Sequence, residues 1–238
     1  IRCRKKLTIF WRWKMPERVR SFCFRFLKNK FVPKPPRLKK SKALPRIFSQ
    51  KCRDFFLIWM NILSALMQPL AEVVVSSVRA LPPSDALAVR SQPQPESLLP
   101  SRPLRAGFVS KHIRDCTVGQ YFKRFLTELG DEDIEVHVYA CGVRDAFTDE
   151  VASRTTLRHV ADDARALHTL AQAIASDVLD VLIYPEIGME PVVEKLAAMR
   201  LAPLQCALWG HPVTTGLPTI DVFLSAVALE PPDAATHY

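Results

Sequence analysis

The pattern of hydrophobic and polar positions after residue 103 alternates between two periods. Short apolar runs rich in β-branched residues predict strands, and stretches with apolar residues three and four positions apart predict helices. The predicted strands cover residues 104–110, 134–141, 157–161, 179–186, 204–210 and 220–226. The predicted helices cover residues 118–129, 164–176 and 191–200. Strands and helices thus alternate with short connections, which favours a parallel sheet.

This alternation predicts an α/β fold with a doubly wound, Rossmann-like parallel sheet and helices on both faces, in a domain at residues 104–238. Ligands of such sheets gather beyond the carboxyl ends of the strands. Three loops expected there are rich in polar, Gly or Pro residues: SKHIRDCTVG at 110–119, YPEIGMEP at 184–191 and WGHPVTTG at 209–216. We expect these loops to meet at one edge of the sheet and to form a cleft.

The pattern before residue 104 predicts two further segments. Residues 55–78 are apolar over about the length of a bilayer span. Polar residues within this run favour an amphipathic helix that packs on the body or on a partner, so we predict an apolar helix at 54–80. A membrane anchor at 55–78 is the alternative. The Pro- and Ser-rich composition of residues 81–103 is typical of a linker.

Charge separates the chain into two unlike parts. Residues 1–60 hold nineteen Lys or Arg and two acidic residues, whereas residues 104–238 hold eleven and nineteen. We predict that residues 1–53 form a disordered basic arm. Its mixture of basic and aromatic residues also suits an anionic membrane surface or nucleic acid, although it contains no recognised nucleic-acid motif. The net charge of +9 therefore averages an arm and an acidic body.

The cysteines indicate the compartment of the protein, and the chain ends indicate the extent of its reading frame. The six cysteines form no CxxC pair and have no regular spacing, which disfavours a zinc site and a disulfide framework. Reduced thiols are then the default, and we predict a cytoplasmic protein that holds no metal. Ile1 is not an initiator residue and Tyr238 follows EPPDAATH, so we expect a fragment of a longer reading frame.

Two histidines are candidate catalytic groups. His211 lies in the WGHPVTTG loop and could donate to a substrate oxygen or exchange a proton. His159 ends a predicted strand close to Asp162 and Asp163, and could act as a general base. The structural alternatives are that His211 bonds a backbone carbonyl group and that His159 only completes a strand end.

The residues around His211 are candidate binding groups. Two glycines permit unusual dihedral angles, a proline stiffens the loop, and two threonines offer hydroxyl groups or cap the next turn. These residues are Gly210, Pro212, Thr214, Thr215 and Gly216. Neither GxGxxG nor a Walker loop occurs, which disfavours a dinucleotide or nucleoside-triphosphate site. Cys116 follows His112 and Asp115 but has no partner at a defined position, so we predict no cysteine nucleophile.

The segments together resemble the O-linked N-acetylglucosamine transferase family, which includes the SPINDLY-type enzymes. The resemblance covers about residues 104–238 and is most specific at APLQCALWGHPVTTG. It implies an inverting glycosyltransferase of GT-B type, with two Rossmann-like lobes, a nucleotide-sugar donor held mainly by the second lobe, and no metal. The usual donor is UDP-N-acetylglucosamine and the usual acceptor a Ser or Thr hydroxyl group of an intracellular protein. This chain resembles the first lobe only.

The resemblance also carries roles onto individual residues. The loop from Gly210 to Gly216 matches the family's acceptor and sugar loop, and His159 matches a histidine near the reacting hydroxyl group. Two segments depart from the family: Cys116 with the following threonine replaces a common histidine, and YPEIGMEP replaces the more common loop after that strand. The first departure leaves open whether the loop of Cys116 handles a proton, and the second leaves open the donor and acceptor preference.

We therefore predict a fragment of a protein O-GlcNAc-transferase-like enzyme that is inactive alone because the donor-binding lobe is missing. The donor would reach it through that lobe, and a protein or peptide would be the acceptor. The alternative is a non-catalytic peptide-binding module that its basic arm tethers to a membrane or to nucleic acid.

Overall fold

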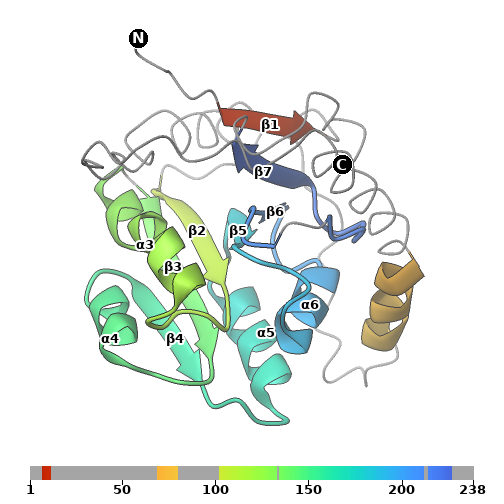
Figure 1. Cartoon of the computed structure of the whole chain (residues 1–238), viewed down its shortest axis with the longest axis horizontal. Helices are drawn as coiled ribbons and strands as arrows, with labels where there is room; N and C mark the ends of the chain where they lie inside the picture. Colours follow the sequence, from red (N-terminus) through yellow and green to blue (C-terminus); the bar gives the residue numbers. More distant parts are fainter. Residues whose placement is uncertain (1–6, 12–68, 80–101, 133, 212–213, 227–238) are drawn as a thin grey trace, which may run out of the picture.

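A computed structural model describes residues 7–11, 69–79, 102–132, 134–211 and 214–226 (Figure 1). The strands are β1 (Leu7–Trp11), β2 (Leu104–Val109), β3 (Ile134–Cys141), β4 (Thr156–Val160), β5 (Val181–Tyr184), β6 (Leu204–Ala207) and β7 (Val222–Ala226). The helices are α3 (Thr117–Glu128), α4 (Ala146–Ala152), α5 (Ala166–Ser176) and α6 (Pro191–Ala198), with a 3-10 turn η1 (Leu129–Glu132) and a helical segment at 69–79.

The strands form a sheet in the order β1-β7-β6-β5-β2-β3-β4. The six strands from β2 onward run parallel to their neighbours, and β1 pairs with β7 in the antiparallel sense. Strands β3 and β4 are added in turn on one side of β2, and β5 then pairs with the other side of β2. This is the strand order of a Rossmann sheet, and its switch point lies between β2 and β5. The predicted doubly wound α/β fold is confirmed.

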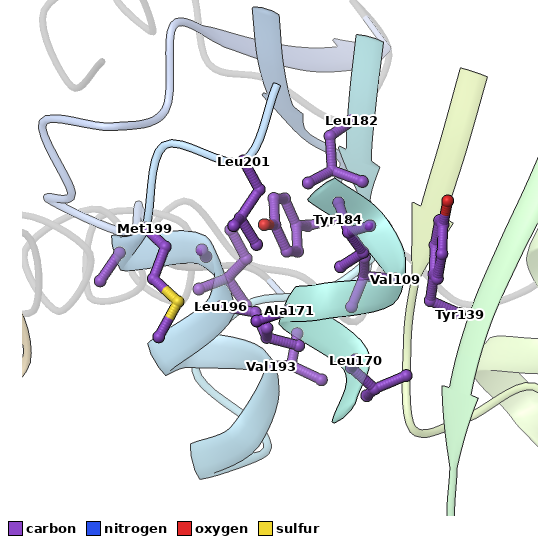
Figure 2. Close-up of a cluster of buried hydrophobic side chains, with 14 of the residues drawn as sticks. Val109, Tyr139, Leu170, Ala171, Leu182, Tyr184, Val193, Leu196, Met199 and Leu201 are labelled. Carbon is purple, nitrogen blue, oxygen red and sulfur yellow. The ribbon is translucent and has the colours of Figure 1, made fainter. Parts of the chain in front are cut away.

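Two hydrophobic clusters cover the two faces of the sheet. The α3/α4 cluster joins Phe122 and Phe125 of α3 and Phe147 of α4 to the side chains on one face, such as Phe108. The α5/α6 cluster joins those two helices to the other face. Figure 2 shows Leu170 and Ala171 of α5 and Val193 and Leu196 of α6 packed against Val109, Leu182 and Tyr184 of the strands. Burial of both faces explains why the strands read as continuous apolar runs.

The structure adds one helix that the hydrophobic pattern did not predict. Helix α4 begins after Asp145, whose carboxylate accepts a hydrogen bond from the Thr148 backbone N–H at 2.9 Å. The Thr148 side chain in turn accepts from the Asp145 backbone N–H, which completes a capping box. The helix has only seven residues, and its buried Phe147 and Val151 make too short a pattern to stand out from a loop.

Part of the N-terminal region is also described. Leu7–Trp11 forms an edge strand, so the disorder that we predicted for residues 1–53 does not apply to these positions. The LTIFW sequence is rich in good strand formers and pairs with the otherwise open edge of β7. The other residues of the predicted arm and the linker residues 81–101 lie outside the described parts of the chain.

The helix at 69–79 is amphipathic and packs on the body beside α6 (Figure 1, orange). Ala71, Val74, Val75 and Val78 lie at helical spacing and contact the α5/α6 cluster, whereas Val73 is 65% exposed. This is the amphipathic helix expected within 54–80, although residues 54–68 are not described. None of the helices in the described parts of the chain combines the length and the apolar character that crossing a bilayer requires.

Replacement of Val74 by Asp is expected to destabilise the protein by about 1–3 kcal/mol, because a charged carboxylate would replace an apolar contact. Val73→Asp is the matched control on the neighbouring exposed position and should change the free energy of unfolding by less than about 0.5 kcal/mol. Urea unfolding followed by far-ultraviolet circular dichroism measures both values. Equal values for the two variants would show that this helix does not pack on the body in solution.

Candidate functional site

A buried hydrogen bond joins the two strands at the switch point of the sheet. Ser110 follows β2 and Glu186 follows β5, and the Ser110 hydroxyl group donates to Glu186 Oε1 at 2.6 Å. Their exposed fractions are 2% and 1%. The Ser110 oxygen also accepts the His112 backbone N–H at 2.9 Å. Hydrogen bonds therefore connect the loop after β2 to the loop after β5 at the place where ligands of this fold bind.

Glu186 is held in its neutral form near physiological pH. Burial in an apolar environment disfavours the carboxylate and raises the pKa of Glu186 to about 8, against the smaller opposing effect of the Ser110 hydrogen bond. Its Oε2 atom has no hydrogen-bond partner among the described residues. A protonated carboxyl group at this position can donate as well as accept a hydrogen bond.

Lys111 connects three loops at the same edge. Its ammonium group lies 2.9 Å from a carboxylate oxygen of Asp162, which follows β4, and 2.9 Å from Glu190 Oε2, which follows β5. The hydrogen bonds to Asp162 and Glu190 raise the pKa of Lys111 above its ordinary value. The loops after β2, β4 and β5 are thus held together by one charged side chain.

The loop after β6 packs closely against the loop after β5. The Leu208 N–H donates to the Tyr184 carbonyl group at 2.9 Å, and the Gly210 N–H donates to the Pro185 carbonyl group at 2.9 Å. A Cβ atom on Gly210 would lie 2.4 Å from that Pro185 oxygen, so only glycine fits here. Trp209 packs against α3, with its ring centroid 5.6 Å from that of Phe122. The prediction that the three loops meet at one edge agrees with these contacts.

His211 lies against Gly188 at the meeting point of the last two loops. Its ring carbon Cε1 and its Nδ1 atom lie 3.5 Å from the point where a Cβ atom of Gly188 would stand. Gly188 has φ of +95°, which favours glycine. The His211 Nδ1 atom is buried and has no hydrogen-bond partner among the described residues. The structural alternative, a bond from this nitrogen to a backbone carbonyl group, is therefore not seen there.

The other predicted residues of this loop differ in their contacts. The Thr215 hydroxyl oxygen accepts the Leu217 N–H at 3.2 Å, so Thr215 does cap the next turn, as the structural alternative stated. Gly216 has φ of +64° and makes that turn. Thr214 is half-buried, and Pro212 lies outside the described residues. Thr214 is thus the threonine of the pair that shows no structural bond among the described contacts.

His159 lies at the other side of the sheet. It is the second-last residue of β4 and pairs in register with Ala140 of β3. Three strands separate β4 from β6, which corresponds to roughly 19 Å at the usual strand spacing. Asp162 pairs with Lys111. The structure therefore does not bring His159 and His211 together, and the role that the resemblance implies for His159 stays a prediction.

Gln205, which lies in the segment that carries the resemblance, and Cys116, which departs from the family, both have structural contacts. Gln205 is fully buried in β6, where its Oε1 accepts the Leu201 N–H at 2.9 Å and its Nε2 donates to the Thr219 carbonyl group at 3.0 Å. Cys116 is the residue before α3, and its Sγ lies 3.6 Å from the His112 carbonyl oxygen. Within the described ranges, no three His, Cys, Asp or Glu side chains group as metal ligands would.

Sequence reasoning named the loops but missed three side chains in them. Ser110, Lys111 and Glu186 all stand within the segments quoted for the carboxyl ends of the strands. Their partners lie far along the chain; Ser110 and Glu186, for example, are 76 residues apart. A glutamate directly after a buried strand was the signal that could have identified Glu186.

Comparisons with known proteins point to one family. No family model matches the chain. It is 29% identical over 144 residues to a probable UDP-N-acetylglucosamine–peptide N-acetylglucosaminyltransferase SPINDLY of Arabidopsis thaliana, with 56% of this chain and 15% of the relative covered. The proteins of the same name from Solanum lycopersicum and Oryza sativa are 30% and 32% identical over 148 and 147 residues, each with 58% of this chain and 15% of the relative covered.

A solved structure gives a further match. A mutant O-GlcNAc transferase of Thermobaculum terrenum is similar over 63% of this chain and 28% of its own, with a TM-score of 0.48 and 22% identity. The chain spans about 15% of the length of the curated relatives it matches. Over the region they share, the chain is similar to three SPINDLY proteins, which agrees with the resemblance to the O-linked N-acetylglucosamine transferase family that the sequence motifs indicated.

Proposed function

We propose that this chain forms the acceptor-side lobe of an enzyme that transfers N-acetylglucosamine from UDP-N-acetylglucosamine to Ser or Thr hydroxyl groups of proteins. The observation that carries the proposal is the position of His211, which lies against Gly188 where the loops after β5 and β6 meet beside the switch point. The SPINDLY relatives are named for this donor and for peptide acceptors.

The chemistry assigns a task to each group of this edge. In an inverting transfer, the acceptor oxygen attacks the anomeric carbon opposite the departing diphosphate and gives up its proton. The imidazole ring of His211 can accept a hydrogen bond from a hydroxyl group or donate one to it. Thr214 offers a hydroxyl group in the same loop, and Gly210 lets the backbone approach closely. The proposal includes no metal, and it places the enzyme in the cytoplasm.

We further propose that a second lobe outside these 238 residues holds the diphosphate. The SPINDLY relatives are several times longer than the region they share with this chain, which supports this division. Transfer of labelled N-acetylglucosamine to protein acceptors tests it, with the chain alone compared with the product of the full reading frame. We expect transfer only from the full product. Turnover by the 238 residues would overturn the division of labour, and absence of transfer from both would overturn the enzymatic proposal.

In the full product, His211→Ala is expected to lower kcat by 10²-fold or more, in the range typical of a lost proton-handling group. The melting temperature should change little, because the His211 Nδ1 atom has no bond to lose. His159→Ala changes a histidine on β4, which three strands separate from β6, and it should lower kcat less. A parallel fall of kcat and melting temperature in His211→Ala would instead support a structural role for this ring.

The comparison of the 238-residue chain with the full product also tests the alternative of a non-catalytic binding module. A full product that binds peptides and transfers no sugar would support it. Contact of residues 1–53 with an anionic membrane or with nucleic acid lies in a part of the chain that is largely outside the described residues, and it stays a prediction.

A further inference from the structure

Glu186 is the buried carboxyl group nearest to the switch point, and none of the roles above uses it. It stands two residues before Gly188, on which the His211 ring lies. Its carboxyl group is tied to the loop after β2 through Ser110. The carbonyl group of the preceding residue, Pro185, accepts the Gly210 N–H of the loop after β6. The short segment 185–188 therefore touches both neighbouring loops.

We propose that Glu186 is a positioning residue, whose buried carboxyl group anchors the loop after β5 to Ser110 so that Gly188 supports the His211 ring. This inference rests on the proposed function only in so far as the position of His211 matters for sugar transfer. The contacts of Glu186, Gly188 and His211 do not depend on the proposed function. Glu186 acts through the loop, because it is 1% exposed and cannot touch a substrate directly.

The Ser110 hydrogen bond by itself favours the ionised carboxylate, but burial opposes ionisation of Glu186 more strongly. Ionisation would leave a charge in an apolar environment, with the Ser110 hydroxyl group and the backbone N–H of Glu186 itself as donors, and this costs several kcal/mol unless the loop opens to water. Because burial raises the pKa of Glu186 to about 8, this change falls just above neutral pH. The proposal thus predicts that His211 loses its place on Gly188 as the pH rises.

Among the charged groups around this loop, Glu190 favours the neutral form of Glu186. Within the loop, Glu190 repels an ionised Glu186 and raises its pKa further. From the loop after β2, Lys111 is paired with Glu190 and with Asp162 of the loop after β4. His112 lies in the same loop as Lys111, and burial lowers its pKa, which favours the uncharged ring. His211 is the titratable group that faces the loop from β6.

The test uses the 238-residue chain and needs no catalysis. We would measure the nuclear Overhauser contact between the His211 ring and the Gly188 α-protons at about pH 6.5 and about pH 9.5, on either side of the Glu186 pKa of about 8. His211→Gln identifies the ring signal. In the unaltered chain we expect the contact at the lower pH and its loss at the higher pH. In Glu186→Gln, which keeps the shape and cannot ionise, we expect the contact at both.

Two further variants complete the test. Glu190→Gln is the matched control in the same loop, and it should keep the loss at the higher pH. Ser110→Ala removes the hydroxyl donor and should weaken the contact at the lower pH while the amide spectrum stays dispersed. If Glu186→Gln does not fold, Ser110→Ala tests the proposal in its place. The proposal is overturned if the contact survives in Ser110→Ala and in the unaltered chain at the higher pH, or if Glu186→Gln loses it as the unaltered chain does.

Failure of this inference and failure of the proposed function give different results. If the contact follows Glu186 as expected and the full product transfers no sugar, the positioning role stands and the enzymatic proposal falls. If the full product transfers sugar and the contact between His211 and Gly188 is unaffected by the state of Glu186, only the positioning role falls.

Discussion

Replacement of Glu186 by Gln is expected to make the protein more stable at pH 8, by on the order of 3 kcal/mol. The pKa of this carboxyl group is about 8 in the folded protein and near 4.5 in an unfolded chain. Between these values the folded state holds a proton that the unfolded state has released, so the free energy of unfolding falls as the pH rises and levels off above about pH 8. A glutamine has no proton to release and avoids this fall.

The magnitude follows from the same linkage. A one-unit difference in pKa between the folded and unfolded states corresponds to about 1.4 kcal/mol. The Glu186 side chain is almost fully buried, so solvent screening removes little of this energy, although opening of the loop limits the total. The amide oxygen of the glutamine can still accept the Ser110 hydroxyl group, which bonds Oε1 at 2.6 Å in the unaltered protein.

Urea unfolding at a series of pH values between about 4 and 9 measures this effect. In Glu186→Gln the free energy of unfolding should not fall with rising pH as it does in the unaltered chain. The two proteins should be similar in stability at the lowest pH. Glu190→Gln changes a partly exposed carboxylate that is paired with Lys111, and it should keep the fall. Superimposable profiles for the unaltered chain and Glu186→Gln would contradict a neutral buried carboxyl group.

Gly210→Ala is the second substitution with a large expected effect. Its Cβ atom would stand 2.4 Å from the Pro185 carbonyl oxygen and 3.0 Å from a ring carbon of Phe122. The first neighbour is backbone and cannot rotate away, so the loop must separate and the bond from the Gly210 N–H to Pro185 must break. We expect a loss of roughly 2–4 kcal/mol in the free energy of unfolding. In the full product, displacement of the adjacent His211 should also lower kcat by at least tenfold.

Gly130→Ala is the matched control for that substitution. A Cβ atom on Gly130 would meet nothing within 4 Å, and its φ is not among the positive values of the described glycines. Its effect should lie between no change and a stabilisation of about 1 kcal/mol. Chemical unfolding of both variants makes the comparison. A Gly210→Ala protein as stable as Gly130→Ala would show that the two loops are not in contact in solution.

Much of the fold was predictable because its determinants are local in the sequence. The apolar run at 134–141 was predicted with the bounds of β3, Ile134–Cys141. The run at 179–186 was predicted too long at both ends, since β5 covers only Val181–Tyr184 and the two residues after it leave the sheet to form the site. Helix α4 was missed because its capping box and its two buried apolar residues are too few for a periodic signal.

The site was predictable to the level of its loops. Polar residues after strand ends identified the segments at 110–119, 184–191 and 209–216, because parallel strands bring their carboxyl ends to one edge. The assignment of individual residues was less complete. Thr215 caps a turn, and three strands separate β4, which holds His159, from β6, which precedes the loop of His211. Glu186 and Lys111 were not named at all.

The sequence by itself determined most of the strands and helices of the parallel sheet and which loops follow the strands, because each depends on residues close together in the chain. The strand order was decided only in the tertiary structure, since several orders of parallel strands would bury the same apolar runs. Placing β5 beside β2 brought Ser110 to Glu186, and the same order separated His159 from His211. The burial that keeps Glu186 neutral arises only from this packing.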